Sequence, residues 1–387
     1  MPISPMKILE TNWSFTHGRV LHTGVELGVF DALAKRSRGA AEVARRCKAT
    51  PRGMRMLLDA LAAMGFLRKK RGRQGGHAAR GSTGSACASG WEYSLAPISA
   101  EYLVKGKETY IGGMVRHAEN LMSRWQDLAA RVRGHVPKRL AKARGPGMFV
   151  HLADSLFPSN FPSAKEAAAK LVPRRAQIAT RSLEGRHREL PPTASFDVLD
   201  IGCGAAPWSI AMALRRGDVR VVANDFELVL PVAKKYALRY GVADRFSYLP
   251  GNLREVDFGV GRFDLVILGN ICHSEGERGT KILFGKVRRA LKPGGRVAII
   301  EILPNRHRTG PLHPLLFALN MLVGSGEGDV FSFEEYAAWL RETGFSRVKA
   351  LPMENRYPFI VGTAPVKGQS CGFDAPKPGA VDEEGVK

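Results

Sequence analysis

The sequence lacks the features that mark disulfide-linked proteins, metal-binding proteins, and membrane-spanning or secreted proteins. Its 387 residues include only five cysteines, without paired spacing, and no cysteine–histidine cluster, so neither disulfides nor a metal ion are indicated. No apolar run approaches the length of a membrane span, and the amino terminus lacks the charged and apolar regions of a signal peptide. We therefore expect a cytoplasmic protein with no membrane span.

Acidic residues are also scarce relative to basic ones. The chain has 36 Asp and Glu against 58 Lys and Arg, which gives a formal net charge of +22 at pH 7. Such an excess attracts polyanions without sequence preference, so a nucleic-acid-binding function has to be weighed. The length exceeds what a single hydrophobic core usually supports and predicts two domains.

The amino-terminal part has the pattern of a winged helix-turn-helix. Thr50 and Pro51 provide a cap and first turn for a helix over 54–64, and a strand begins at Phe66. A second strand is expected around 91–95. The intervening segment 68–90 is basic and then rich in glycine and serine, which predicts a flexible basic wing.

The most informative segment is Phe196–Gly204, an apolar strand that ends in a glycine turn. Gly202 and Gly204 allow a ligand to approach the backbone closely. A dinucleotide site needs a third glycine three places later, and this chain has Pro207 there, which suits the first turn of a helix instead. The turn therefore predicts a nucleotide-type cofactor without a pyrophosphate.

The segments that follow alternate between strand and helix. A second strand, 220–225, ends in Asp225, the acid that such folds direct at a ribose. A third strand closes with Gly251, a fourth covers 263–268, and a fifth covers 296–301. This order predicts an α/β fold with an open sheet.

These residues resemble the class I S-adenosylmethionine-dependent methyltransferases, and within them the dimeric small-molecule O-methyltransferases of secondary metabolism. The resemblance implies S-adenosyl-L-methionine (SAM) as cofactor, released as S-adenosyl-L-homocysteine (SAH), and no metal. It implies a seven-stranded Rossmann-like methyltransferase sheet that follows an N-terminal, mostly α winged-helix dimerisation domain, and hence a homodimer. The implied cofactor-binding residues are Asp200, Gly202, Gly204, Asp225, Phe226, Gly251, Asn252, Leu253 and Asn270.

The resemblance and the composition together predict four segments. Residues 1–105 form the winged-helix dimerisation domain, and 106–190 form a helical linker that covers the acceptor pocket. Residues 191–364 form the Rossmann-like, SAM-binding catalytic domain. The Pro-, Gly- and charge-rich residues 365–387 are expected to be a disordered tail.

The catalytic segment of this family typically reads Asn-x-x-His-Asp-Trp. Here it resembles Asn270-Ile-Cys-His273, and Ser274 and Glu275 replace the Asp-Trp pair. The resemblance implies that His273 is the general base, because imidazole titrates near neutral pH and can take a hydroxyl proton. Glu301 matches the family glutamate that orients this histidine.

The acceptor is expected to be a small molecule held in a mostly apolar pocket. The resemblance places its contacts in two segments, with the candidates Met148, Phe157, Asn160, Phe161, Phe317 and Met321. A second family glutamate corresponds to Glu327 or to Asp329, and the sequence leaves that choice open.

Three alternatives remain beside O-methylation. The altered catalytic segment leaves room for S-methylation of a thioether acid, as in sulfonium-osmolyte biosynthesis, and then for C-methylation of a tetrapyrrole or quinone. The third is a winged-helix nucleic-acid-binding regulator. However, the helix over 54–64 offers only Arg55 to read bases, so no specific nucleic acid is expected as a partner.

Overall fold

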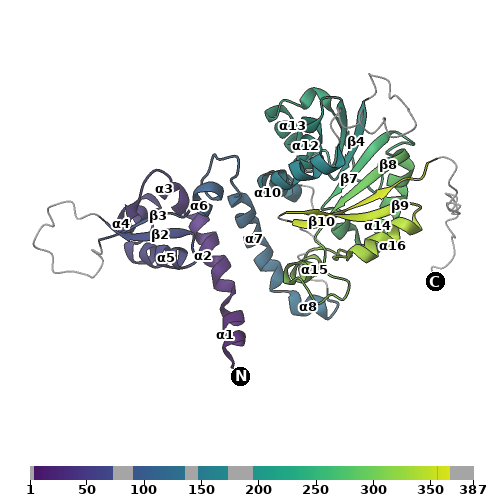
Figure 1. The fold of residues 1–387 in the computed structure, drawn as a ribbon. Helices are drawn as coiled ribbons and strands as arrows, with labels where there is room; N and C mark the ends of the chain where they lie inside the picture. The colour runs from purple at the N-terminus through teal and green to yellow at the C-terminus, as the bar shows by residue number, and fades with distance from the viewer. Residues whose placement is uncertain (1–3, 73–89, 136–146, 173–194, 355, 367–387) are drawn as a thin grey trace, which may run out of the picture. The chain divides into compact units, whose positions relative to one another are not determined.

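The computed structural model of the chain describes residues 4–72, 90–135, 147–172, 195–354 and 356–366 (Figure 1). The chain forms two compact units, Met1–Ala164 and Lys165–Lys387. Most of the expected wing (73–89), parts of the expected linker (136–146 and 173–194) and nearly all of the expected tail (367–387) lie outside the described residues.

The first unit begins with helices and a small antiparallel sheet, as the sequence predicts. Its first five helices are α1 (Met6–Trp13), α2 (Phe15–Glu26), α3 (Val29–Leu33), α4 (Ala40–Arg46) and α5 (Pro51–Ala63). The strands β1 (Arg38–Gly39), β2 (Leu67–Arg71) and β3 (Trp91–Leu95) lie in the order β1-β3-β2. The cap expected at Thr50 is confirmed, since its hydroxyl oxygen accepts the Gly53 N–H at 3.2 Å.

Further helices complete this unit. They are α6 (Pro97–Tyr102), α7 (Gly112–Trp125), α8 (Leu128–Val132) and the long α10 (Gly147–Leu171), whose last residues belong to the second unit. A core of fully buried apolar side chains joins α3, α5 and β3, and includes Phe30, Leu58, Leu61 and Tyr93. The basic, exposed residues of β2 point away from this core.

The second unit contains the predicted seven-stranded sheet. Its strands are β4 (Phe196–Ile201), β5 (Val219–Asp225), β6 (Phe246–Pro250), β7 (Phe263–Gly269), β8 (Leu291–Ile300), β9 (Ser346–Met353) and β10 (Arg356–Thr363). They lie in the order β6-β5-β4-β7-β8-β10-β9. The first five are parallel, and β10 runs antiparallel to both β8 and β9.

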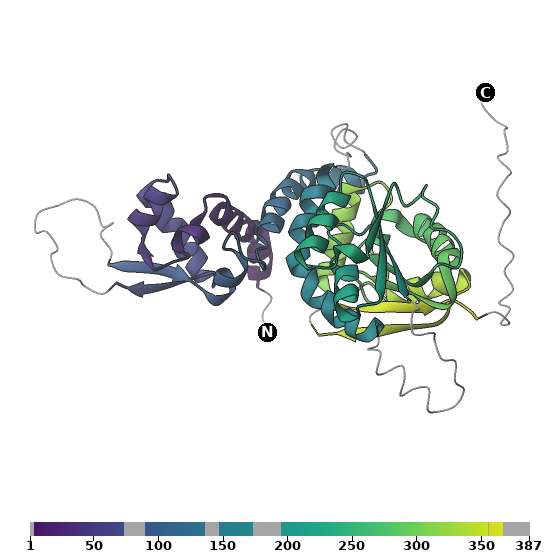
Figure 2. The same ribbon diagram turned by 90° about the horizontal axis from the view of Figure 1, so that it is seen from above.

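Helices cover both faces of this sheet. Figures 1 and 2 show α12 (Pro207–Arg215) and α13 (Leu230–Arg239) on one face, with α14 (Cys272–Ala290) and α16 (Phe333–Glu342) on the other. Pro207 stands in the first turn of α12, as predicted. Helix α15 (Leu312–Gly324) follows β8. The main core fills the space between the sheet and α14 and α16.

The strand order determines where a ligand can bind. The chain runs outward from β4 through β5 to β6, then returns to place β7 on the other side of β4. Ligands of open α/β sheets bind beyond the carboxyl ends of the strands at such a reversal. The glycine turn after β4 and the catalytic segment after β7 both lie at this edge.

Candidate active site

The glycine turn after β4 adopts a backbone that other residues rarely adopt. Gly202 and Gly204 have φ angles of 63° and 56°. A Cβ atom at Gly202 would also lie 3.0 Å from Cδ1 of Ile271, so a side chain there would be both strained and crowded. The turn thus presents bare backbone at the edge of the sheet.

Asp225 holds this turn against the end of β5. Its carboxylate accepts the Gly204 N–H at 2.8 Å through one oxygen and the Phe226 N–H at 2.8 Å through the other. Burial raises the pKa of Asp225, and the two backbone donors act in the opposite direction. A carboxylate has about four acceptor positions, so this one has capacity for two further donors, such as the hydroxyls of a ribose.

Asp200 is almost completely buried, with 1% of its surface exposed. The Ser209 hydroxyl donates to its Oδ2, whereas its Oδ1 has no hydrogen-bond partner among the described residues. Burial is the main reason that its pKa rises to about 7, and the nearby Asp225 adds to the shift. An orphaned carboxylate oxygen beside the glycine turn fits a cationic amino group such as that of SAM.

Asn224, which the sequence analysis missed, orders the loop after β6. Its buried amide donates to the carbonyl oxygens of Leu249 at 2.9 Å and Gly251 at 3.2 Å. The Gly251 N–H in turn donates to the Asp225 carbonyl at 3.0 Å. The available signal was a polar side chain, directly before Asp225, after three apolar residues of the strand.

The other predicted cofactor residues follow β6 and β7. The Asn252 side-chain oxygen accepts the Arg254 N–H at 3.1 Å, and Leu253 packs against the main core. Asn270 has a φ of 59°, a conformation that Asn tolerates better than most residues. Its N–H donates to the Ile300 carbonyl at 2.8 Å, which joins the ends of β7 and β8.

His273 and Glu301 form a bonded pair. The backbone N–H of His273 donates to Oε1 of Glu301 at 3.2 Å, and the ring Nδ1 lies 2.8 Å from Oε2. Because a carboxylate can only accept, Nδ1 carries the proton and Nε2 is left as the acceptor. Glu301 is 3% exposed and directly follows β8, which ends at Ile300, so it does not end the strand as expected from sequence.

The choice between Glu327 and Asp329 is not settled by contact with the histidine ring. The Asp329 backbone N–H donates to the His273 carbonyl at 3.0 Å, and its carboxylate accepts the Val330 N–H at 2.7 Å. Among the described residues, neither acid has a hydrogen bond to the His273 side chain. The loop therefore supports the backbone of His273.

The predicted acceptor residues are distributed over both units. In the second unit, Phe317 of α15 meets the His273 ring edge-on, with centroids 5.0 Å apart, and Met321 lies one turn further along the helix. In the first unit, Phe157, Asn160 and Phe161 are buried residues of α10. The side chain of Met148 lies outside the described residues.

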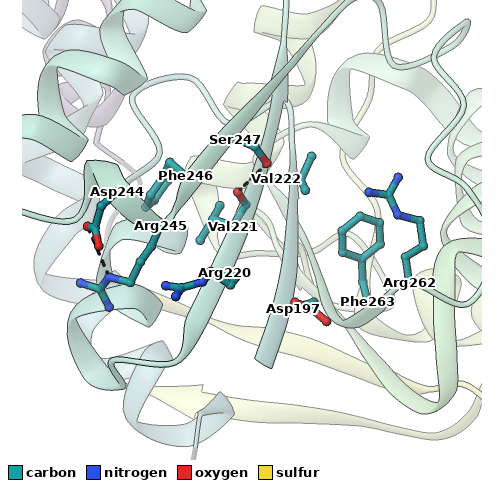
Figure 3. A pocket seen from close by; sticks show the side chains of 10 residues that line it. All are labelled: Asp197, Arg220, Val221, Val222, Asp244, Arg245, Phe246, Ser247, Arg262 and Phe263. Atoms are coloured by element: carbon teal, nitrogen blue, oxygen red, sulfur yellow. Dashed lines mark hydrogen bonds and ion pairs between the residues drawn. The ribbon is translucent and has the colours of Figure 1, made fainter. Parts of the chain in front are cut away.

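A cavity of about 420 Å³ lies at the other edge of the sheet (Figure 3). It is lined by the first residues of β4, β5, β6 and β7 and by residues just before them, including Arg220, Arg245 and Arg262. It lies at the amino ends of the strands whose carboxyl ends lead to the glycine turn and His273, so it is not the site of the predicted chemistry.

In the described part of the chain, no group of three or more His, Cys, Asp or Glu side chains could hold a metal ion. In the same residues, no helix is long and apolar enough to cross a membrane.

This geometry is that of a SAM-dependent methyltransferase, and comparison with known proteins agrees. The sequence pattern of the O-methyltransferase domain matches residues 125–346, and that of the O-methyltransferase dimerisation domain matches 10–105. The chain belongs to the O-methyltransferase family. It is a SAM-dependent methyltransferase that acts on a small-molecule acceptor.

Individual relatives match along nearly the whole chain. The tetracenomycin polyketide synthesis 8-O-methyl transferase TcmO of Streptomyces glaucescens is 28% identical, over 93% of this chain and 97% of its own. A Nostoc punctiforme protein classed with the O-methyltransferases has a TM-score of 0.75 at 27% identity, covering 94% of this chain and all of its own. Human N-acetylserotonin methyltransferase in complex with SAM has the same fold, with a TM-score of 0.74 at 22% identity over 94% of this chain and 99% of its own.

Proposed function

We propose that this enzyme transfers the methyl group of SAM to a hydroxyl of a small aromatic acceptor, with His273 as general base. The observation that carries the proposal is the pairing of His273 with the buried Glu301, which leaves Nε2 as a proton acceptor beside Phe317. An aromatic ring beside the base suits a planar acceptor.

In the proposed reaction, SAM supplies the methyl group, and His273 and Glu301 act on the proton of the acceptor. SAM supplies an electrophilic methyl group on a sulfonium sulfur, which keeps the bonding electrons when the acceptor oxygen takes the methyl group. Nε2 of His273 takes the hydroxyl proton, a contribution of roughly 10²- to 10⁴-fold. The Glu301 carboxylate stabilises the resulting imidazolium through its 2.8 Å contact with Nδ1.

The cofactor residues have distinct roles in this proposal. The carboxylate of Asp225 accepts the ribose hydroxyls, and the orphaned oxygen of Asp200 accepts the amino group. The loop of Gly251, Asn252 and Leu253 holds the adenine. The reaction needs no metal, because the His273–Glu301 pair supplies the base.

We further propose that the enzyme is a homodimer. The match to the dimerisation domain supports this, as do the exposed apolar side chains of α1 and the start of α2. Trp13 is 67% exposed and Phe15 is 62% exposed, although large apolar groups gain from burial. In this proposal, a second copy of the chain covers these exposed apolar side chains. Analytical ultracentrifugation would detect the dimer by its mass.

The alternatives are less well supported. The His273–Glu301 pair favours an acceptor that must lose a proton, and a thioether sulfur has none to lose. Glu275, one of the two residues that replace the Asp-Trp pair of the family motif, is paired with Arg254 at 2.8 Å and so has a structural partner. The base-reading candidate Arg55 is paired with Asp59 at 3.1 Å, which argues against sequence-specific nucleic-acid binding.

The test is methyl transfer from labelled SAM to a panel of phenols, quinols and thioether acids, comparing the native enzyme with His273→Ala. We expect a phenol to be methylated and kcat to fall by roughly two or more orders of magnitude in the variant. SAH calorimetry on both proteins checks that the cofactor site is intact. Near-native turnover by His273→Ala would refute the general base and favour sulfur.

A further inference from the structure

An arginine stands at the carboxyl edge of the sheet near the base. Arg356 is the first residue of β10, the strand that pairs with β8. The carbon of its guanidinium lies 5.4 Å from the ring centroid of Trp208, which is buried in the first turn of α12. Arginine stacks well on aromatic faces, so Trp208 fixes where this charge stands.

The Arg356 guanidinium has no directly bonded acidic partner among the described residues. Among the described residues it makes no hydrogen bond and no ion pair of 4.0 Å or less. Burial lowers the pKa of Arg356, and the carboxylate of Glu301 raises it. The group keeps its charge at neutral pH and offers five N–H donors. Burial outweighs the effect of Glu301, so a bound anion at this place would stabilise the partly desolvated charge.

A packing contact and a shared acid connect this arginine to the catalytic segment. The indole of Trp208 packs on the backbone of Gly269, where an added Cβ would lie 2.6 Å from Nε1, and Gly269 directly precedes the segment that leads to His273. Glu301, the acid that acts on the charge of Arg356, is also the acid bonded to His273. The positive charge and the base therefore share one edge of the sheet.

Aromatic side chains stand at the same edge. Phe317 meets the His273 ring, and His313, one turn earlier in α15, stacks on Tyr357 with centroids 6.3 Å apart and planes at 10°. Tyr357 directly follows Arg356 in β10. Flat aromatic surfaces and a cation at one edge of the sheet match a planar ring that carries one negative charge.

We propose that Arg356 binds a carboxylate of the acceptor, so that the preferred substrates are aromatic hydroxy acids. This inference rests on the proposed function, because the hydroxyl of the same molecule must reach His273. The planar fork of the guanidinium matches a carboxylate through two parallel hydrogen bonds. The carboxylate itself takes no part in bond making. Arg356 is thus a specificity-determining residue.

The test uses matched pairs of acceptors that differ only in charge. 3-Hydroxybenzoate is compared with 3-hydroxybenzamide, and 6-hydroxy-2-naphthoate with 6-hydroxy-2-naphthamide, using labelled SAM. The native enzyme should prefer the acids by about tenfold or more in kcat/KM. Arg356→Met should lose about tenfold to a hundredfold with the acids, chiefly through KM, and change about twofold or less with the amides. Arg356→Lys should fall between the two.

The control is Arg262→Met. Arg262 also stacks on a ring, 5.1 Å from the Phe263 centroid, but it lies at the amino ends of the strands. This variant should keep the acid preference. SAH calorimetry on every variant checks that the fold and cofactor site persist, and Arg356→Lys serves if Arg356→Met does not fold.

The possible results distinguish the role of Arg356 from the proposed function. Equal use of acids and amides by the native enzyme, equal losses for both in Arg356→Met, or failure of every acid to react would overturn the role of Arg356. If neutral phenols still react and SAH still binds, the proposed function survives that failure. Absence of SAH binding or of methyl transfer to any phenol would instead count against the proposed function.

Discussion

The contact of Asp225 with the glycine turn leads to the sharpest prediction. Asp225→Ala removes the acceptor for the N–H groups of Gly204 and Phe226, both at 2.8 Å, together with the proposed acceptor for two ribose hydroxyls. A hydrogen bond to a charged group contributes about 1.5–3 kcal/mol. Two such bonds to the ribose give about 3 kcal/mol at the lower end.

Because about 1.4 kcal/mol corresponds to a tenfold change in Kd, SAH should bind Asp225→Ala roughly a hundredfold more weakly. Calorimetric titration with SAH measures this without an acceptor. Asp225→Asn keeps the shape but turns one oxygen into a donor that faces a backbone N–H, so an intermediate loss is expected.

A matched control separates binding from general damage to the sheet. Asp197→Asn changes a half-buried acid at the start of β4, where the carboxylate pairs with Lys292 at 2.8 Å, at the opposite edge. It should bind SAH with nearly native affinity. A Kd for Asp225→Ala within about threefold of the native value, with the fold intact, would refute the assignment of this acid to the ribose.

Three further predictions follow from other groups. The pKa of Asp200, raised to about 7 by burial, means that its ionised form grows as pH rises, so SAH should bind about five- to tenfold more tightly at pH 7.5 than at pH 6. In the ligand-free fold the same acid keeps its proton where the unfolded chain, with a pKa of 3.8, has lost it. Its contribution to stability therefore falls as pH rises from about 4 to 7, and Asp200→Asn should weaken both trends, with the rest due to Asp225, whose pKa burial also raises. Glu301→Gln should lower kcat by about tenfold to a hundredfold with little change in SAH affinity, and an unchanged kcat would exclude it as the partner of His273. Ser332→Ala breaks the capping box of α16 with Glu335, costs about 1 kcal/mol and should lower Tm by about 2–4 °C in a thermal melt, leaving SAH binding intact.

The features that local sequence can specify were predicted correctly. The alternation of strands and helices and the entry of Pro207 into α12 follow from apolar periodicity and from the restricted backbone of glycine and proline, whereas the count of seven strands came from the resemblance to a family. The cap at Thr50 is equally local, since its partner is three residues away. These signals depend on residues that are close together along the chain.

The contacts that complete the site are not local. Glu301 lies 28 residues after His273, and its two hydrogen bonds exist because β7 and β8 are neighbours in the sheet. The sequence suggested the pairing only through resemblance to a family. It marked Asn224 only as a polar residue before Asp225 and could not show that its amide bonds the loop of Gly251, because a strand residue reveals its partner only once the next strand is in place.

The amino-acid sequence by itself indicated a nucleotide-type cofactor without a pyrophosphate, because a glycine turn, an acid at the next strand end and a proline in place of the third glycine are local features, and the resemblance to a family then implied SAM. Only the tertiary structure decided which charges meet at the carboxyl edge. Arg356 reaches Trp208 from a strand formed 148 residues later, because β10 inserts between β8 and β9. Burial at that edge lowers the local dielectric constant and so strengthens the interactions between these charges. The spacing of residues along the chain does not encode this burial.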